Sequence, residues 1–350
     1  MALSSSPRLG VVIVSFETSH DLLDCVESLL AATGVRLDIV VVDNASRDGT
    51  PDLLRDWAAG RLDRSPSADT PFPIEEVPKP VTIHDVPPSA DPEGHRLTLI
   101  EAGVNGGYAA GVNRGLAALM ADKGLERVWV LNPDSIIPAE TPQAFATEPG
   151  PAEGFALMGG RVLYLETPEI IQMDGGTINR RTGVTGNLGL GARSDDFPMS
   201  DPDRIDFISG ASMVASRAFY ETTGPMLEDY FLYYEEVDWA LRRGTLPLAY
   251  CPDGVVYHRA GTAIGSPTLN RPASPFSQYF KHRARLMFVR RHFPWSLPTA
   301  IAYSLAKAAQ LRLKGYRAEA RAVLDGSFGR PPAAEIRERL SPEAQALAFR

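Results

Sequence analysis

The stretch LGVVIVS at residues 9–15 decides how the N-terminal half of this chain folds. Its unbroken run of apolar, mostly β-branched side chains is typical of a strand that is buried on both faces of a sheet. Residues 37–42 repeat this pattern, and leucines at helical spacing predict helices over residues 21–32 and 50–59. Strand, helix, strand and helix with short connections predict a parallel, doubly wound α/β sheet.

The regular alternation breaks at residues 60–96, which are rich in Pro, Asp and Ser and show no helical period. A loop of that length in a compact domain is usually functional or disordered, and we expect a surface insertion. Regular structure is expected to resume with a strand at 97–100, a helix over 109–123 and a strand at 127–131. Further expectations are irregular structure through 138–206 with strands near 156–165, mixed turn and helix over 219–244, a strand near 248–250, and two basic helices after 277 that Pro294 and Pro298 separate.

The composition is that of an ordinary globular protein. The 350 residues are 44% apolar and 22% charged, and this length favours one large α/β domain with an appendage, or two domains. The net charge of −8 argues against a nucleic-acid-binding protein. Residues 281–321 nevertheless contain ten Lys or Arg and one acid, Glu319, which leaves the remainder of the chain near −17. A basic C-terminal patch on an acidic body indicates contact with an anionic surface, either a membrane or a charged acceptor.

Cysteine use and hydropathy predict a cytoplasmic protein. Cys25 and Cys251 are far apart in the sequence and lack metal-site spacing, which is typical of reduced thiols. No apolar run reaches about eighteen residues, so no membrane-spanning helix is expected. Residues 1–10 lack the apolar stretch of a signal peptide.

Polar residues follow three of the predicted strands. Asp43 follows the second strand, the Gly-rich segment at 105–113 follows the third, and Asn132-Pro-Asp134 follows the fourth. Ligands of open α/β sheets bind outside the carboxyl ends of the strands, so we expect these residues to converge on one crevice. Asp43 there would accept hydrogen bonds from ribose hydroxyls or a base N–H, or it forms an Asx-turn or helix cap. Asp134 would hold a hard divalent cation together with a diphosphate.

His258 and the acidic segment at 231–239 are the remaining candidates. His258 follows another short apolar strand and would complete the metal coordination, although a lone histidine is more often structural. The segment FLYYEEVDW places Glu235, Glu236 and Asp238 within four positions after an aromatic run. Such a cluster holds a general base, faces a cation or basic side chain, or simply starts a helix.

Seven segments occur in a characteristic order, namely VVIVSF, VVDNAS, GVNGGYAAGVNRGL, LNPDS, FISGASMVASRAFY, FLYYEEVDWALRRG and VVYHRAGTA. They resemble family 2 glycosyltransferases of the GT-A fold over residues 9–293, with the closest likeness to the bacterial rhamnosyltransferase-like branch. The resemblance implies a Rossmann-like nucleotide-binding sheet merged with an acceptor-binding region, followed by C-terminal helices. The implied divisions are a GT-A domain over 1–276, with a nucleotide-binding part at about 9–138, an acceptor and catalytic part at about 139–276 and the insertion at 60–96, and a basic helical region over 277–350.

The same resemblance implies inverting transfer of a sugar, with rhamnose a candidate, from a nucleotide-diphosphate donor to an acceptor hydroxyl of a cell-surface polysaccharide or glycolipid. It implies Mg or Mn held by Asp134 and His258, and a general base at Glu236, with Glu235 and Asp238 as supporting charges. Two positions depart from the family pattern, because Asn132 replaces the first acid of Asp-x-Asp and Glu236 replaces the commoner Asp. The implied donor-binding residues are Ser15, Glu17, Asp43, Asn105, Gly107, Asn113, Asn132, Asp134 and Gly210.

The expected partners are a nucleotide-diphosphate sugar and a glycan or lipid-linked acceptor, without nucleic acid. The basic C-terminal helices predict peripheral contact with an anionic membrane at its inner face, with a solvated helix face or a homo-oligomer contact as alternatives. Three other functions would use some of the same candidate site residues. They are a glycoside hydrolase, which needs two carboxylates but no nucleotide crevice, a nucleotidyltransferase, and an inert nucleotide-sugar-binding protein.

Overall fold

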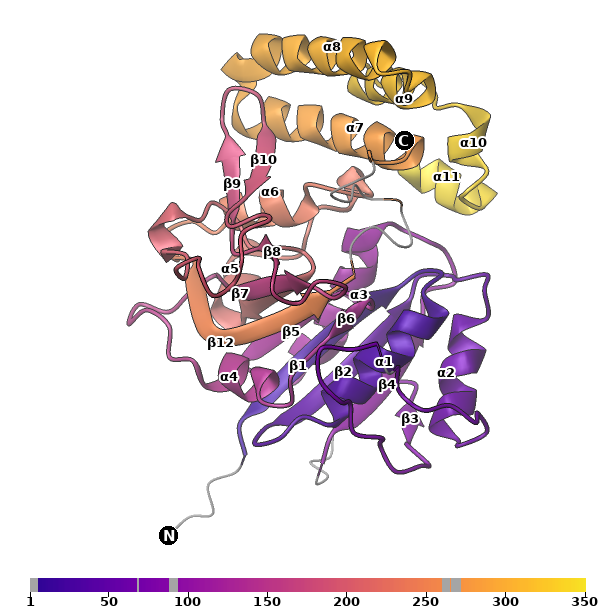
Figure 1. Ribbon diagram of the computed structural model, residues 1–350, viewed down its shortest axis with the longest axis vertical. Coiled ribbons are helices and arrows are strands. Elements are labelled where there is room, and N and C mark those ends of the chain that lie inside the picture. Colours follow the sequence, from indigo (N-terminus) through magenta and orange to yellow (C-terminus); the bar gives the residue numbers. More distant parts are fainter. Residues whose placement is uncertain (1–5, 68, 88–93, 260–264, 266–271) are drawn as a thin grey trace.

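The computed structural model describes residues 6–67, 69–87, 94–259, 265 and 272–350. A mixed sheet with helices on both faces forms the body of the protein, and a layer of C-terminal helices packs above one end of it (Figure 1). The strands are β1 Arg8–Ser15, β2 Arg36–Asp43, β3 Ile83–His84, β4 Arg96–Glu101, β5 Arg127–Leu131, β6 Ser135–Ile136, β7 Leu157–Tyr164, β8 Ile171–Met173, β9 Gly176–Asn179, β10 Val184–Asn187, β11 Ser212–Ser216 and β12 Ala249–His258.

The helices connect and cover these strands. They are α1 Ser19–Leu30, α2 Thr50–Ala58, α3 Tyr108–Met120, α4 Thr141–Thr147, α5 Arg217–Thr223, α6 Glu235–Leu241, α7 Pro275–His292, α8 Leu297–Leu313, α9 Arg317–Ser327, α10 Ala334–Arg337 and α11 Pro342–Ala348, with single 3-10 turns η1 Pro202–Arg204, η2 Glu228–Tyr230 and η3 Pro294–Ser296. Among the described residues, ten strands form one sheet in the order β3-β4-β2-β1-β5-β11-β7-β12-β6, with β8 paired to β7, and β9 and β10 form a hairpin.

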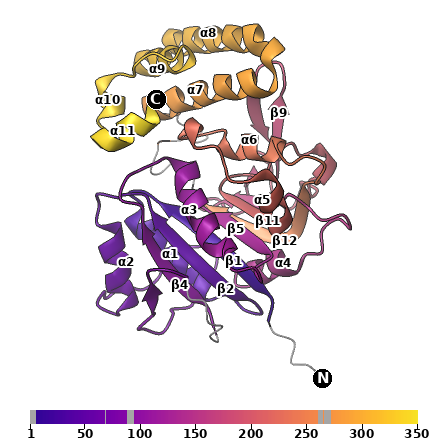
Figure 2. The ribbon, with the colours of Figure 1, turned by 180° about the vertical axis from the view of Figure 1, so that it is seen from behind.

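The predicted doubly wound arrangement of the N-terminal half is confirmed. Strands β4, β2, β1 and β5 are parallel neighbours. Val11 and Ile13 of β1 pack with α1 and α2, whereas Val12 packs with α3 on the opposite face. This two-sided burial explains the unbroken apolar run of β1. Figure 2 shows α3 alone in front of the strands that α1 and α2 cover from behind.

The second half is more regular than the sequence indicated. Residues 138–206, expected to be largely irregular, contain α4 and the strands β8, β9 and β10 besides β7. These strands have only three or four residues each, too few to show an alternating pattern against turn-rich flanks. Strand β11 was also not predicted, and it lies antiparallel between β5 and β7. The strand expected near 248–250 extends to His258.

The insertion lies against the helices of the N-terminal half. Its described residues before β4 are exposed or half-buried, and Ile83 pairs with Leu97 at the sheet edge. Lys79 Nζ contacts Glu27 Oε1 of α1 at 3.0 Å, and Arg64 contacts Asp24 at 2.7 Å. These ion pairs fix the insertion to α1.

Helices α7 to α11 form the C-terminal layer, in which α7 lies closest to the sheet and α8 forms the outer edge (Figures 1 and 2). Side chains of α7, such as Phe288 and Val289, belong to the same buried cluster as the sheet residues next to α3. The division of the chain at residue 276 stays a prediction. No described helix is both long and apolar enough to span a bilayer.

Candidate active site

The loops after β2, β4 and β5 meet at the carboxyl edge of the parallel strands, as predicted. Asn44 Nδ2, next to Asp43, donates to Asn105 Oδ1 at 3.1 Å. On the other side of β1, the Asn132 N–H donates to the Ala211 carbonyl at 3.0 Å. Since β11 runs antiparallel to β5, its first residues meet the end of β5 and bring residues 209–211 to this edge.

Asp43 ends β2 and is 2% exposed. Its Oδ2 accepts a hydrogen bond from the Ser46 N–H at 3.0 Å, which is the turn-forming role considered from the sequence. Its Oδ1 is buried and finds no hydrogen-bond partner in the part of the chain that the structure describes. Burial raises the pKa of Asp43, and the contacts with Ser46 oppose that shift. A buried acceptor without a partner at this edge is available to a ligand N–H or hydroxyl.

Ser15 and Glu17 connect the end of β1 to the loop after β2. Ser15 Oγ lies 3.0 Å from Thr18 Oγ1, and the backbone N–H of Glu17 donates to Ser46 Oγ at 3.0 Å. Arg47 donates to Glu17 Oε1 from Nε at 2.9 Å and from Nη2 at 2.8 Å. The two loops therefore form one continuous wall beside Asp43.

The Gly-rich segment positions the start of α3 against the aromatic stretch before α6. Asn105 Oδ1 accepts from the Gly107 N–H at 2.9 Å, which shapes the turn. Gly107 has a φ of +90°, and a Cβ there would lie 2.2 Å from the Phe231 carbonyl oxygen. The next N–H, that of Tyr108, donates to the same carbonyl at 2.9 Å. Only glycine permits this close approach of two backbone segments, so the fold itself requires glycine at position 107.

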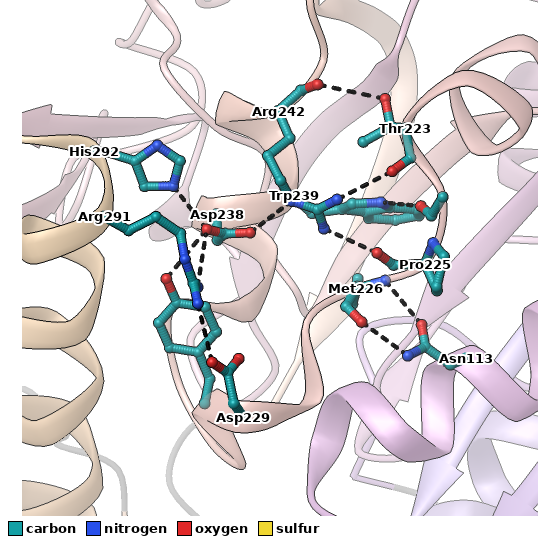
Figure 3. A network of polar contacts seen from close by, with 12 residues as sticks. Asn113, Thr223, Pro225, Met226, Asp229, Asp238, Trp239, Arg242, Arg291 and His292 are labelled. Atoms are coloured by element: carbon teal, nitrogen blue, oxygen red, sulfur yellow. Dashed lines mark hydrogen bonds and ion pairs between the residues drawn. The ribbon is translucent and has the colours of Figure 1, made fainter.

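Asn113 does not join the other predicted donor-binding residues. Its Nδ2 donates to the Met226 carbonyl and its Oδ1 accepts from the Met226 N–H, each at 2.9 Å (Figure 3). The same Nδ2 also donates to Glu228 Oε1 at 2.9 Å. The amide thus fixes the segment that precedes η2. We remove Asn113 from the candidate donor site because its donor and acceptor atoms are already used by the protein.

Asp134 and His258 form the centre of the candidate metal site. His258 Nε2 lies 3.1 Å from Asp134 Oδ1 and 3.1 Å from Asn132 Nδ2. On the other side of the ring, His258 Nδ1 lies 2.7 Å from Gln172 Oε1 of β8. Burial works to lower the pKa of His258, but the carboxylate of Asp134 outweighs it and leaves that pKa raised. Gln172 orients the imidazole through its far nitrogen, and no sequence pattern pointed to this residue.

Gly210 and Tyr108 link this region to the acidic segment. The Tyr108 hydroxyl donates to the Gly210 carbonyl at 2.6 Å. A Cβ on Gly210 would lie 3.7 Å from Glu236 Cγ, so the loop before β11 lies directly beside Glu236. Burial, together with the charges of Glu236, Glu235 and Asp134, raises the pKa of Tyr108 well above its ordinary value. Tyr108 is therefore close enough to interact with the charges of Glu235, Glu236 and Asp134. Its position in a Gly-rich segment did not reveal this interaction.

Glu235 and Glu236 begin α6 and lack ion-pair partners within the described residues. Glu235 is 2% exposed, and burial followed by the charge of Glu236 raises its pKa well above the usual range. Glu236 is half-buried, and burial raises its pKa too, while nearby backbone N–H groups and Lys281 of α7 work against the increase. Carboxylates with raised pKa values are candidates for proton transfer.

Asp238 is in the opposite situation. It is fully buried, and it accepts hydrogen bonds from Arg242 Nε at 2.7 Å, the Tyr230 hydroxyl at 3.1 Å and, from α7, His292 Nε2 at 2.7 Å (Figure 3). Arg291 Nη1 lies 3.5 Å away. Burial would raise the pKa of Asp238, but His292 and Arg242 reverse the shift and lower it. The Asp238 side chain therefore joins α6 to α7. Its role as a supporting charge for the base stays a prediction.

The same segments also contain non-glycine residues in a left-handed backbone conformation. Within the described residues, the non-glycine positions with positive φ are Glu17, Ala45, Phe231, Tyr233 and Tyr234. All five lie in the loops after β1 and β2 or in the stretch that leads into Glu235. Left-handed backbone is unfavourable for such residues and tends to occur at functional sites, where the surroundings maintain it.

Two sequence comparisons find proteins that this chain resembles. A family model described as glycosyl transferase family 2 matches residues 10–68. The low-salt glycan biosynthesis hexosyltransferase Agl10 of Haloferax volcanii is 25% identical over 242 residues, which make up 67% of this chain and 61% of Agl10. The chain thus spans about three fifths of the length of that relative.

Solved structures are similar across most of the chain. The mannosyltransferase PcManGT from Pyrobaculum calidifontis, in complex with GDP-Man and Mn²⁺, has a TM-score of 0.50 at 16% identity and covers 93% of this chain and 88% of its own. GalNAc-T7 with UDP, GalNAc and Mn²⁺ has a TM-score of 0.53 at 13% identity, covering 91% and 55%. S. aureus TarS 1-349 has a TM-score of 0.50 at 12% identity, covering 97% and 83%. The predicted fold is confirmed: the protein is a GT-A fold with added C-terminal helices.

Proposed function

We propose that the protein is a glycosyltransferase that moves a sugar from a nucleotide-diphosphate donor to an acceptor hydroxyl, with inversion at the anomeric carbon. The observation that carries the proposal is the pairing of Asp134 with His258 at the sheet edge that also holds Asp43. The family 2 match and the relative described as a hexosyltransferase support the same reaction and favour a hexose as the transferred group.

The side chains of Asp134 and His258 suit a divalent cation. Their carboxylate oxygen and imidazole nitrogen lie 3.1 Å apart, and two ligands bound about 2.1 Å from one ion lie about 3 Å apart. The described residues contain no group of three or more His, Cys, Asp or Glu that suits a metal, so a donor diphosphate and water would supply the other ligands. When bound, Mn²⁺ or Mg²⁺ would offset the negative charge that develops on the leaving diphosphate.

Asp43 is proposed to bind the nucleoside of the donor. Its open Oδ1 would accept from a base N–H or a ribose hydroxyl. Neighbouring strands lie about 4.8 Å apart, so the carboxyl ends of β2, which carries Asp43, and of β5, which leads to Asp134, lie about 10 Å apart with β1 between them. That separation suits a nucleoside at one end and its diphosphate at the other. The walls formed by Ser15, Glu17, Asn105, Gly107 and Asn132 would hold the donor between them.

Glu236 is proposed as the general base. A carboxylate whose pKa is raised toward neutrality can take the proton from an acceptor hydroxyl as that oxygen bonds to the sugar. Gly210 lies directly beside Glu236, so the loop before β11 would contact the sugar or the acceptor there. Attack on the face opposite the leaving diphosphate inverts the anomeric carbon, which is why the base and the metal ligands belong on different loops.

Four finer points belong to the same proposal. The acceptor is a glycan or lipid-linked glycan of a cell-surface polysaccharide or glycolipid, and rhamnose is one donor sugar to test. The reaction takes place in the cytoplasm, a location that suits the two buried, unpaired thiols of Cys25 and Cys251. The nucleotide-binding part is proposed at about 9–138 and the acceptor part at about 139–276.

Donor-dependent thermal stabilisation tests the proposal. A panel of nucleotide-diphosphate sugars is screened by thermal unfolding with Mn²⁺ and again with EDTA. A donor at about 100 times its dissociation constant should stabilise the fold by about 2.7 kcal/mol, and EDTA should remove the effect. Asp134→Ala should abolish the metal-dependent shift, whereas the exposed Asp253→Ala serves as the control that keeps it. Equal stabilisation of the Asp134→Ala variant would place the metal and donor elsewhere.

Product analysis then separates the remaining reactions. The transferase releases a nucleoside diphosphate and forms an inverted glycosidic bond. A nucleotidyltransferase instead releases pyrophosphate, and a glycoside hydrolase releases free sugar from a glycan without any nucleotide. A protein that binds the donor and yields no product with any acceptor is a binding protein, and the proposed reaction is then wrong.

A further inference from the structure

Helix α8 is apolar on two opposite sides. Its inner side is buried against α7 and α9 through Ala300, Ser304, Ala308 and Leu311. Its outer side is not covered by any described residue, yet it is also apolar, with exposed residues at helical spacing. These outer residues are Ala302, Leu305, Ala306, Ala309 and Leu313.

The outer side continues into the turn before α8, where Trp295 is 96% exposed. At the far end of the helix, Leu313 is 89% exposed, and Leu305 between them is 48% exposed. The 17 residues of α8 span about 25 Å. Figures 1 and 2 place α8 at the outer edge of the molecule, on the side away from the sheet. We call Trp295 and the outer residues of α8 the α8 surface.

Cationic side chains lie at both ends of the α8 surface. Arg290 precedes it, Arg312 lies in its last turn, and Lys314 and Arg317 follow it; all are exposed and none has an ion pair within the described residues. Other basic residues of this region serve the fold instead, since Arg285 donates to the Ala300 carbonyl at 3.0 Å. Between residue 281 and Glu319 the sequence contains no acid.

We propose that the α8 surface binds the headgroup region of an anionic phospholipid bilayer. An exposed tryptophan and leucines with flanking Lys and Arg have the composition of helices that lie in the membrane interface. The negative charge of the remaining chain repels the same bilayer, so attraction and repulsion together orient this side toward it. A contact between two copies through this surface would bring the arginines and lysines of both together, which opposes dimerisation.

Vesicle co-sedimentation tests the proposal without donor or acceptor, so its outcome is independent of the proposed reaction. The full-length protein is mixed with vesicles of phosphatidylcholine alone or with phosphatidylglycerol added. Binding is expected only to the anionic vesicles, and it should weaken as ionic strength rises from about 0.1 M to about 0.5 M. The variant Trp295→Ser with Leu313→Gln should bind about tenfold more weakly, and so should Arg312→Glu with Lys314→Glu.

Matched controls are Met199→Gln, an exposed apolar side chain elsewhere, and Arg61→Glu with Lys123→Glu, which reverses the same number of exposed charges. Both controls should bind vesicles as the unaltered chain does. Absence of binding to anionic vesicles, or binding that the α8 variants leave unchanged, overturns the proposal. Concentration-dependent dimers in sedimentation equilibrium that Trp295→Ser with Leu313→Gln dissociates, without vesicle binding, would instead identify the surface as a contact between copies.

Discussion

The first turn of α6 contains three acids in two contrasting environments. Glu235 and Glu236 lie at its start beside Tyr108 and Gly210, where burial raises their pKa values. Asp238, less than one turn later, accepts from Arg242 and His292 and has a lowered pKa. Cationic partners favour the ionised form of a carboxylate, whereas burial without such partners favours its protonated form. Glu235 and Glu236 therefore suit proton transfer, whereas Asp238 suits a structural role that holds α6 against α7.

The largest expected effect is on the transfer reaction. Glu236→Gln keeps the shape of the side chain but cannot accept a proton, so the transfer rate should fall about a thousandfold. Metal-dependent stabilisation by the donor should persist, because Asp43, Asp134 and His258 are unchanged. Steady-state assays of product formation measure the rate, and Glu153→Gln, an exposed glutamate, provides the control. A variant that retains the rate within about threefold would move the base to another residue.

The next effect is on stability. Asp238→Asn leaves Arg242 and Arg291 without their buried counter-charge, and it should lower the free energy of unfolding by about 3 kcal/mol. Because the pKa of Asp238 is lowered in the fold, its contribution is present above the usual aspartate pKa and is lost as the pH falls through the lowered value. Urea unfolding at neutral and acidic pH measures both.

A neighbouring acid supplies the control for Asp238. Asp229 contacts Arg291 at 3.0 Å with a side chain that is 42% exposed, so Asp229→Asn should cost less than about 1 kcal/mol. If both variants lost a similar amount of stability, the buried contacts of Asp238 would contribute no more to the free energy of unfolding than an exposed ion pair does. The contrast between Asp238 and the pair Glu235 and Glu236 would then have no energetic basis.

This contrast was only partly predictable from the sequence. The strand ends at Asp43 and Asp134 follow from apolar runs, whose carboxyl ends share an edge in any parallel sheet. The partners of Asp238 could not be predicted, since His292 is 54 residues away and reaches it only through the packing of α7 on α6. Gln172 lies on a three-residue strand with no pattern of its own. Asn113 shares a motif with Gly107, but its position further along α3 turns it toward Met226.

Glu235→Gln should change stability in the opposite direction to Asp238→Asn. The raised pKa means that, as the pH rises above the usual glutamate pKa, the fold keeps a proton that the unfolded chain has released, so the wild-type fold loses stability as the pH rises. Glutamine removes that loss, and we expect a gain on the order of 1 kcal/mol at neutral pH that vanishes below the usual glutamate pKa. Urea unfolding across this pH range measures the gain. A loss of stability at neutral pH would show that ionised Glu235 has a partner in solution.

The smallest expected effect is on the pH dependence of the transfer rate. Glu235, Tyr108, Tyr234 and Lys281 are titratable groups that interact with Glu236, and Lys281 is the one among them that lowers its pKa. Lys281→Met should therefore raise the pKa of Glu236, so the acidic limb of the pH–rate profile moves to higher pH. The rate at alkaline pH, where the base is ionised in either protein, should stay within about twofold.

Helical spacing explains why Lys281 reaches this carboxylate. Ser277 and Phe288 of α7 contact Tyr233 and Tyr234, and Lys281 lies one turn after Ser277 on the same side of the helix. Lys307→Met on α8 is the matched control, because Lys307 interacts with Lys281 but not with Glu236. An acidic limb that moves equally in both variants would reflect the net charge of the protein. A limb that only Lys281→Met moves would show that α7, which lies outside the parallel sheet, tunes the pKa of the proposed base.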